Sequence, residues 1–124
     1  KLADFARSLS DKVQMVDDAT RTRLHIAAVI TNNFSNHLFT LAQDFCTKEG
    51  LDFSLLHPLL EETVNRLAQY QPADMQTGPA IRGDEVVIKN HLSLIQQYPY
   101  LTNVYEQMTK SIQNWYHTTT EIKP

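Results

Sequence analysis

The sequence predicts an all-α fold, a helical bundle built around one long helix near its N-terminus. Two observations favour this class: apolar residues recur at helical spacing along most of the chain, and residues 18–49 contain neither proline nor glycine. A helix over this stretch would be roughly 48 Å long at ~1.5 Å per residue. A helix of that length in a small protein packs against several neighbours, and a second subunit is one of them.

The ends of the long helix carry the expected signals. Asp17 or Asp18 can act as the N-cap, because a carboxylate accepts hydrogen bonds from the first free N–H groups and is favoured by the helix dipole. Gly50 is expected to end the helix, with Lys48 in its last turn. Leu24, Phe34, Leu38, Leu41 and Phe45 gather on one side of the predicted helix, and Cys46 is expected to be a small buried hydrophobe.

Three shorter helices are expected to follow. The second covers residues 54–70 and the third residues 84–97, with Asp84 as its N-cap. Pro99 separates the third helix from a fourth over residues 100–116, and residues 118–120 read as a fraying tail. The side chains expected to be buried are Leu55, Leu56, Leu59, Leu60, Val64 and Leu67 of the second helix, Val87, Ile88, Leu92 and Ile95 of the third, and Leu101, Val104, Tyr105, Met108, Ile112 and Trp115 of the fourth.

Composition narrows the classes of function. The chain has 124 residues, 42% of them hydrophobic, and a net charge of −3 without any cluster of Lys and Arg. That length fits one domain, and the missing basic patch argues against a nucleic-acid partner. The longest apolar run, residues 26–30, is too short to cross a bilayer, so no membrane association is expected. One cysteine cannot form an internal disulfide, which favours the cytoplasm. No metal-ligand spacing and no glycine-rich nucleotide loop is present.

Residues 1–16 differ from the rest of the chain. Apolar residues at helical spacing are followed by residues 13–16, which read as a short extended run. Nothing later in the sequence could pair with such a strand. It is therefore either an edge element or part of a sheet that lies outside this chain.

A polar stripe runs along the long helix. At about 100° per residue, Arg21, His25, Asn32 and Asn36 fall within roughly 60° of one another. One interpretation is the wet face of an amphipathic helix. The other is that an arginine, a histidine and two amides converge on a polar ligand, which the absence of Lys and Glu from the stripe favours. His25 has the right chemistry for acid–base work near neutral pH.

A second candidate is the loop that holds residues 76–84. Gly78 and Gly83 permit unusual backbone angles, and thirteen irregular residues between helices exceed the usual length of a connection. In the functional interpretation Arg82 clamps an anion, with Gln76 and Thr77 as further donors. In the alternative, the segment is a well-formed connection and Arg82 is merely exposed. His91 lies among apolar residues, where a hydrogen-bonded core histidine is expected.

Together these residues resemble a known family. The matching segments are residues 23–29, Asn33-Phe34, residues 76–84 and His91-Leu92. They resemble the C-terminal domain of a group of bacterial Rossmann-like oxidoreductases. That domain is catalogued as a domain of unknown function and is similar to the C-terminal helical domain of 6-phosphogluconate dehydrogenase.

The resemblance implies a two-domain protein whose NAD(P)-binding half is missing here. Residues 1–16 would be the remnant of that half, and residues 17–124 the C-terminal helical domain, which in such proteins builds a homodimer. By position, the implied catalytic groups facing the nicotinamide are His25, Asn32 and Asn33. Relatives use a lysine on this helix, but the chain has none between Lys12 and Lys48. The implied ligands of a small anionic substrate are Arg21, Asn36, Gln76, Thr77, Arg82 and His91.

Three hypotheses remain open on this basis. The chain is the substrate-binding and dimerisation domain of an NAD(P)-dependent oxidoreductase, a non-catalytic dimerisation domain, or a regulatory ligand-binding module. The first needs the polar stripe and Arg82 to face one shared crevice.

Overall fold

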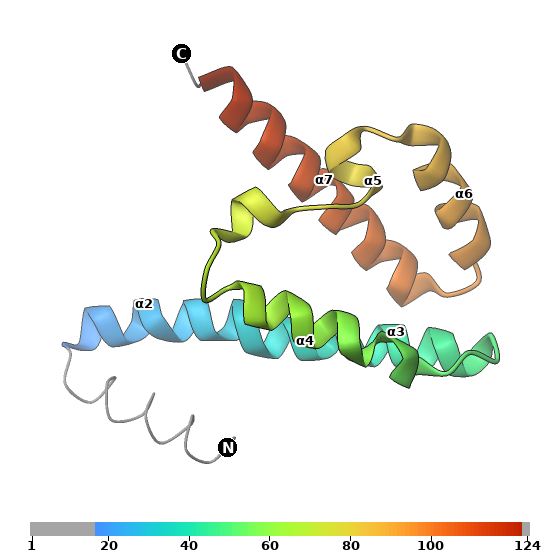
Figure 1. Ribbon diagram of the computed structural model, residues 1–124, viewed down its shortest axis with the longest axis horizontal. Coiled ribbons are helices and arrows are strands. Elements are labelled where there is room, and N and C mark those ends of the chain that lie inside the picture. Colours follow the sequence, from blue (N-terminus) through green and yellow to red (C-terminus); the bar gives the residue numbers. More distant parts are fainter. Residues whose placement is uncertain (1–16, 123–124) are drawn as a thin grey trace. The chain divides into compact units, whose positions relative to one another are not determined.

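The computed structural model describes residues 17–122, with side chains up to residue 117, and is all-α over that range. No strand occurs in it, so the predicted fold class is confirmed. The helical elements, drawn in Figure 1, are α2 (Asp18–Ala28), η1 (Val29–Phe34), α3 (Ser35–Lys48), η2 (Phe53–Leu56), α4 (His57–Arg66), η3 (Pro72–Met75), α5 (Pro79–Arg82), α6 (Glu85–Ile95) and α7 (Pro99–Ile122). The predicted remnant over residues 1–16 lies outside the described residues.

The chain divides into two compact units, Lys1–Thr40 and Leu41–Pro124. The described part of the first unit holds α2, η1 and the beginning of α3. The second unit holds the end of α3 and every element from η2 to α7. Each unit is described by itself.

The first unit begins at a well-formed helix cap. Asp17 has an extended backbone, and its carboxylate accepts a hydrogen bond of 2.7 Å from the N–H of Thr20. This bond holds the pKa of Asp17 below 3.8, because the charged carboxylate accepts it best. The predicted N-cap is therefore found at the first of the two candidate positions.

The predicted long helix contains a π-helical segment. Residues 18–48 are helical throughout, but Val29–Phe34 forms a π-helix between two α-helices. A π turn accommodates about one extra residue, so positions after it are rotated by roughly 100° relative to a regular α-helix. The prediction that placed Asn36 on the face of Arg21 and His25 used a helical wheel and assumed a regular α-helix of about 100° per residue. This assumption is wrong from Val29 onward.

The long helix ends close to Gly50, as the sequence predicts. After Lys48 the chain turns through Gly50 with a φ of 71°, and the N–H of Leu51 donates to the carbonyl of Cys46 over 2.7 Å. Cys46 is 7% exposed, as expected of a small buried hydrophobe.

The α4 region differs from its prediction in length and in burial. It begins as a 3₁₀ turn over Phe53–Leu56, Pro58 lies in the first turn of α4, and the α-helix ends at Arg66 rather than at residue 70. Its apolar side chains were expected to be buried, yet most are exposed. The exposed ones are Leu55, Leu56, Leu59, Val64 and Leu67. The periodicity correctly marks an apolar face, but the described residues do not cover that face.

The core of the second unit lies where α5 and α6 pack against α7 (Figure 1). Ala80 of α5 and Ile88 and Ile95 of α6 are buried, the last two as predicted. The hydroxyl of Thr102 donates to the carbonyl of Ile95 over 2.8 Å and so ties the start of α7 to the end of α6.

Two further predictions about this unit need correction. The loop after α4 is not irregular, because it contains the 3₁₀ turn η3 and the short helix α5. The backbone of residues 118–120 continues α7, which ends at Ile122, instead of fraying. On α7, Met108 and Trp115 are exposed although both were expected to be buried.

Candidate functional site

The loop that the sequence singles out folds as one turn of helix held at both ends. Gly78 precedes α5 with a φ of 100°, and Pro79 opens the helix. Gly83 closes it with a φ of 66°, which a side chain would strain, and the N–H of Asp84 donates to the carbonyl of Pro79 over 2.9 Å. The Asp84 carboxylate then accepts from the N–H of Val87 at the start of α6. Arg82 is thus fixed between two defined turns.

Arg82 lines an open groove between α5 and α7. The groove is open to solvent and has a volume of about 620 Å³. Its α5 side consists of Ala80, Ile81, Arg82 and Gly83, and its α7 side of Gln113, Asn114, Tyr116 and His117. We call this the Arg82 groove. It combines one guanidinium with amide and imidazole groups over apolar side chains.

A second groove adjoins the first along α7. It encloses about 460 Å³ and is lined by Gln71, Pro72, Ala73, Gln76, Ser111, Ile112, Trp115 and Tyr116. We call it the Trp115 groove. Tyr116 lines both grooves, and its hydroxyl donates to the carbonyl of Ala73 over 2.7 Å. The tyrosine is therefore a fixed wall between a groove with an arginine and a groove with an exposed indole.

The predicted substrate-binding residues of the second unit are only partly brought together. Arg82 lines the Arg82 groove and Gln76 lines the Trp115 groove, whereas Thr77 lines neither. The Gln76 amide donates to the Thr77 carbonyl over 3.2 Å. His91 is half-buried and lies 2.8 Å from the Tyr105 hydroxyl, which is the hydrogen-bonded arrangement expected of a core histidine.

The predicted residues of the first unit are all exposed on the long helix. Arg21 forms an ion pair of 3.4 Å with Asp18 one turn earlier. Asn32 and Asn33 lie within the π-helical segment, while His25 precedes it and Asn36 follows it. π-Helical segments occur often at functional sites, so this segment supports the prediction that Asn32 and Asn33 have a functional role. A crevice shared by this stripe and Arg82 stays a prediction, because the two belong to different units.

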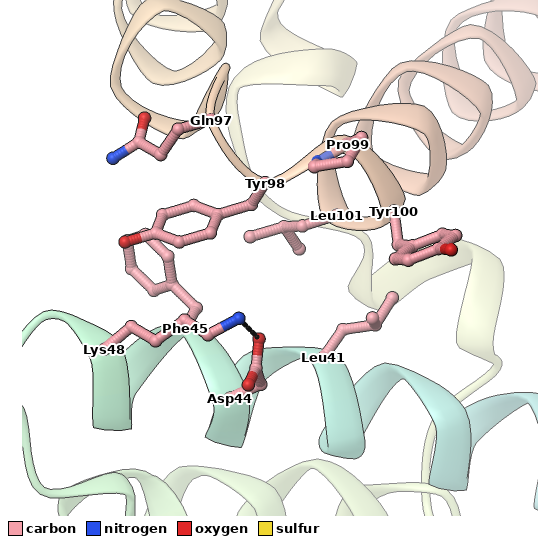
Figure 2. Close-up of a pocket in the computed structure, with 9 residues that line it drawn as sticks. All are labelled: Leu41, Asp44, Phe45, Lys48, Gln97, Tyr98, Pro99, Tyr100 and Leu101. Atoms are coloured by element: carbon pink, nitrogen blue, oxygen red, sulfur yellow. Dashed lines mark ion pairs between the residues drawn. The ribbon is translucent and has the colours of Figure 1, made fainter.

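Figure 2 shows a third, smaller pocket where α3 faces the turn between α6 and α7. Its volume is about 180 Å³, below the usual range for ligand sites. Three of the polar side chains drawn there already have partners: Lys48 pairs with Asp44 at 2.9 Å, and the Tyr98 hydroxyl donates to Glu49. The Phe45 and Tyr98 rings meet edge to face. This pocket is therefore a packing contact between α3 and the turn before α7, and not a candidate ligand site.

Comparison with known proteins identifies the family. Residues 1–112 match the family described as Domain of unknown function (DUF2520). The chain belongs to this family. The matched residues of the DUF2520 domain include the polar stripe and Arg82, whereas residues 113–117 of the two grooves follow the match.

A solved relative of this DUF2520 chain extends the comparison. The crystal structure of a "putative NADP oxidoreductase" from Bacteroides fragilis is 41% identical, with a TM-score of 0.77. The alignment covers 80% of this chain and 38% of that one, so the chain spans well under half of the relative. No curated protein matches. The resemblance to an oxidoreductase domain of unknown function is confirmed, and the likeness to 6-phosphogluconate dehydrogenase stays a prediction.

The α7 side of the grooves is the part that sequence reasoning missed. The sequence pointed to no role for Gln113, Asn114, Tyr116 and His117, and placed Trp115 in the core. Their helical spacing is compatible with either a packed or an open face. Only the packing of the α5 loop against α7 shows that Gln113, Asn114, Tyr116 and His117 stand opposite Arg82.

Within residues 17–122, no group of three or more His, Cys, Asp and Glu side chains is arranged to hold a metal ion. Over the same range, even the 24-residue α7 lacks an apolar stretch that could span a bilayer.

Proposed function

We propose that the chain is the substrate-binding and dimerisation domain of an NAD(P)-dependent oxidoreductase. The observation that carries the proposal is the relative from Bacteroides fragilis. It is 41% identical to this chain, which nevertheless covers only 38% of it. Such a ratio fits one domain of a larger enzyme in which the remaining part binds the nucleotide. A reducing cytoplasm suits the free cysteine, Cys46.

The chemistry assigned to this domain is orientation and proton transfer. Arg82 pairs with an anionic group of a small substrate, because a guanidinium fork matches a carboxylate. His25 would exchange a proton with the substrate oxygen, taking it when an alcohol is oxidised and returning it when a keto acid is reduced. A bound nicotinamide would supply the hydride-transfer chemistry. Asn32, in the π-helical segment, orients the substrate oxygen.

The exposed apolar face of α4 supports the dimerisation role. Five large apolar side chains of the α4 region are exposed, among them Leu59 at 59% and Val64 at 64%. Large contiguous apolar patches on a protein surface mark interfaces. A second copy of the chain covers this face in the proposed homodimer.

Kinetics of the full-length enzyme test the proposal. NADPH consumption is followed with a panel of small keto acids, for the native protein and for His25→Ala and Arg82→Ala. Loss of the proton relay lowers kcat by ~10²–10⁴-fold, as for other acid–base groups. Loss of the clamp raises KM for the acid while leaving KM for NADPH unchanged. Arg23→Ala is the matched control, since Arg23 is an exposed arginine of α2 that lines neither groove.

Each negative result points to a different alternative. Turnover that is unchanged in both variants removes the catalytic proposal. Intact dimers without turnover on any keto acid would leave the domain as a non-catalytic dimerisation module. Binding of a keto acid that depends on Arg82, without NADPH consumption, identifies a regulatory ligand-binding module.

A further inference from the structure

We propose that the Arg82 groove and the Trp115 groove form one site for a small aromatic monocarboxylate. Its carboxylate pairs with Arg82, its body crosses the Tyr116 ring, and its aromatic ring lies against Trp115. The inference rests on the proposed function, because it names the substrate class of the Arg82 clamp.

The charge around Arg82 selects a single negative charge. One guanidinium lines the groove, and the Glu85 carboxylate stands close by, 3.5 Å from the Gln113 amide nitrogen. A dianionic phosphate would meet this carboxylate with like-charge repulsion. A carboxylate instead matches the two-pronged geometry of the guanidinium at half the charge. The Asn114 amide on the facing helix can supply a further hydrogen bond.

The Trp115 groove selects a flat apolar group. The indole of Trp115, the single tryptophan of the chain, is 60% exposed. Ile112 and Pro72 line the groove beside it. The other polar residues there are uncharged, namely Gln71, Gln76 and Ser111. An aromatic ring gains both burial of apolar surface and ring–ring contact at such a place. No charged residue lines this groove among the described residues.

Tyr116 makes the two grooves parts of one site. It lines both, and its hydrogen bond to the Ala73 carbonyl fixes the phenol against η3. A pre-organised wall costs a ligand little conformational entropy on binding. The two grooves hold about 620 and 460 Å³, enough for a ligand with a separate head and ring.

Fluorescence of Trp115 gives a direct binding test on the full chain. The titrants are phenylacetate, 3-phenylpropionate, 4-phenylbutyrate and 5-phenylpentanoate, with 3-phenylpropanol, hexanoate and inorganic phosphate as comparisons. At least one phenyl carboxylate is expected to change the fluorescence with about tenfold higher affinity than the neutral alcohol, the aliphatic acid or phosphate. Arg82→Gln is expected to remove that advantage, because a charge-assisted hydrogen bond is worth about this factor or more.

Two controls keep the inference falsifiable. Arg23→Gln removes an exposed arginine of α2 that lines neither groove and should leave every affinity unchanged. With ligand-observed NMR as the readout, Trp115→Ala should lose the preference for phenyl over hexyl acids, and Trp115→Phe should retain it. Equal binding of the acid and the alcohol, or tightest binding of phosphate, overturns the proposal. So does fluorescence that changes with protein concentration alone, because the face is then an interface between chains.

The binding test of this site and the kinetic test of the proposed function can fail independently of each other. Phenyl carboxylates that bind through Arg82 without supporting NADPH turnover would uphold the site and refute the enzyme. Turnover of non-aromatic keto acids, without Arg82-dependent binding of the phenyl series, would uphold the enzyme and refute this ligand class.

Discussion

His91 and Tyr105 join α6 to α7 through one hydrogen bond and one ring contact. The Nδ1 atom of His91 lies 2.8 Å from the Tyr105 hydroxyl, and the two rings meet edge to face at 84° with centroids 5.8 Å apart. Burial raises the pKa of Tyr105 above 10.0, so the phenol keeps its proton near neutral pH. This pairing explains a histidine within an apolar helix without requiring a ligand.

Removing the Tyr105 hydroxyl should therefore cost folding stability. We expect Tyr105→Phe to lower the free energy of unfolding by about 1 kcal/mol, because a partly buried hydrogen bond is lost while the ring remains. Urea denaturation of the full chain measures the change. Tyr100→Phe is the matched control, since Tyr100 is 80% exposed and should give no measurable change. Equal effects of the two substitutions would show that the His91–Tyr105 bond contributes nothing.

Acid should release the N-terminal cap of α2. The pKa of Asp17 is lowered by its hydrogen bonds from Thr20, so its stabilisation is complete above 3.8 and is lost as pH falls through the lower folded-state pKa. We expect the Thr20 amide resonance to move in that pH window. In Asp17→Asn the amide oxygen still accepts the bond but does not titrate, so the movement should disappear.

The neighbouring carboxylate provides the control for this titration. Asp18 pairs with Arg21 and its side chain is 97% exposed, so Asp18→Asn should leave the Thr20 transition in place. A Thr20 transition that persists in Asp17→Asn would contradict the capping role.

Gly83 should be hard to replace, for reasons of backbone conformation alone. Its φ is 66°, and no heavy atom lies within 4 Å of the place where a Cβ would stand. We expect Gly83→Ala to destabilise the chain by about 1–2 kcal/mol, the cost of a left-handed conformation for an ordinary residue. Gly83→Asn should cost less, because asparagine tolerates this conformation better. Equal unfolding midpoints for the alanine variant and the native chain would refute the argument.

The elements were more predictable than the surfaces that they form. Caps such as Asp17 and Asp84 are local signals, and both are found where the sequence places them. The π-helical segment has no comparable signal, so a regular wheel misplaced Asn36 relative to His25. The α7 side of the grooves depends on the packing of α5 against α7. Gly83 and Gln113, which line the same groove, are 30 positions apart in the sequence. Periodicity cannot encode such a contact.

The apolar face of α4 shows the same limit and leads to a prediction about assembly. Periodicity identified the face, but not what covers it. On a bare surface, Leu59→Gln and Val64→Gln should each change the free energy of unfolding of the monomer by less than about 0.5 kcal/mol, because both side chains are exposed. If a second copy covers the face, as proposed, the same variants should shift the sedimentation profile from dimer to monomer.

Val86→Gln supplies the comparison for this assembly test. Val86 is 80% exposed on α6, away from the α4 stripe in sequence, and its substitution should leave the dimer intact. The pattern expected of a dimer interface is weakened association in the two α4 variants and none in the α6 variant, with unchanged helical circular dichroism in all three. A native chain that sediments as a monomer at every concentration would refute the assignment of this face to a homodimer interface. The exposed leucines of α4 would then not be covered by a second copy of the chain.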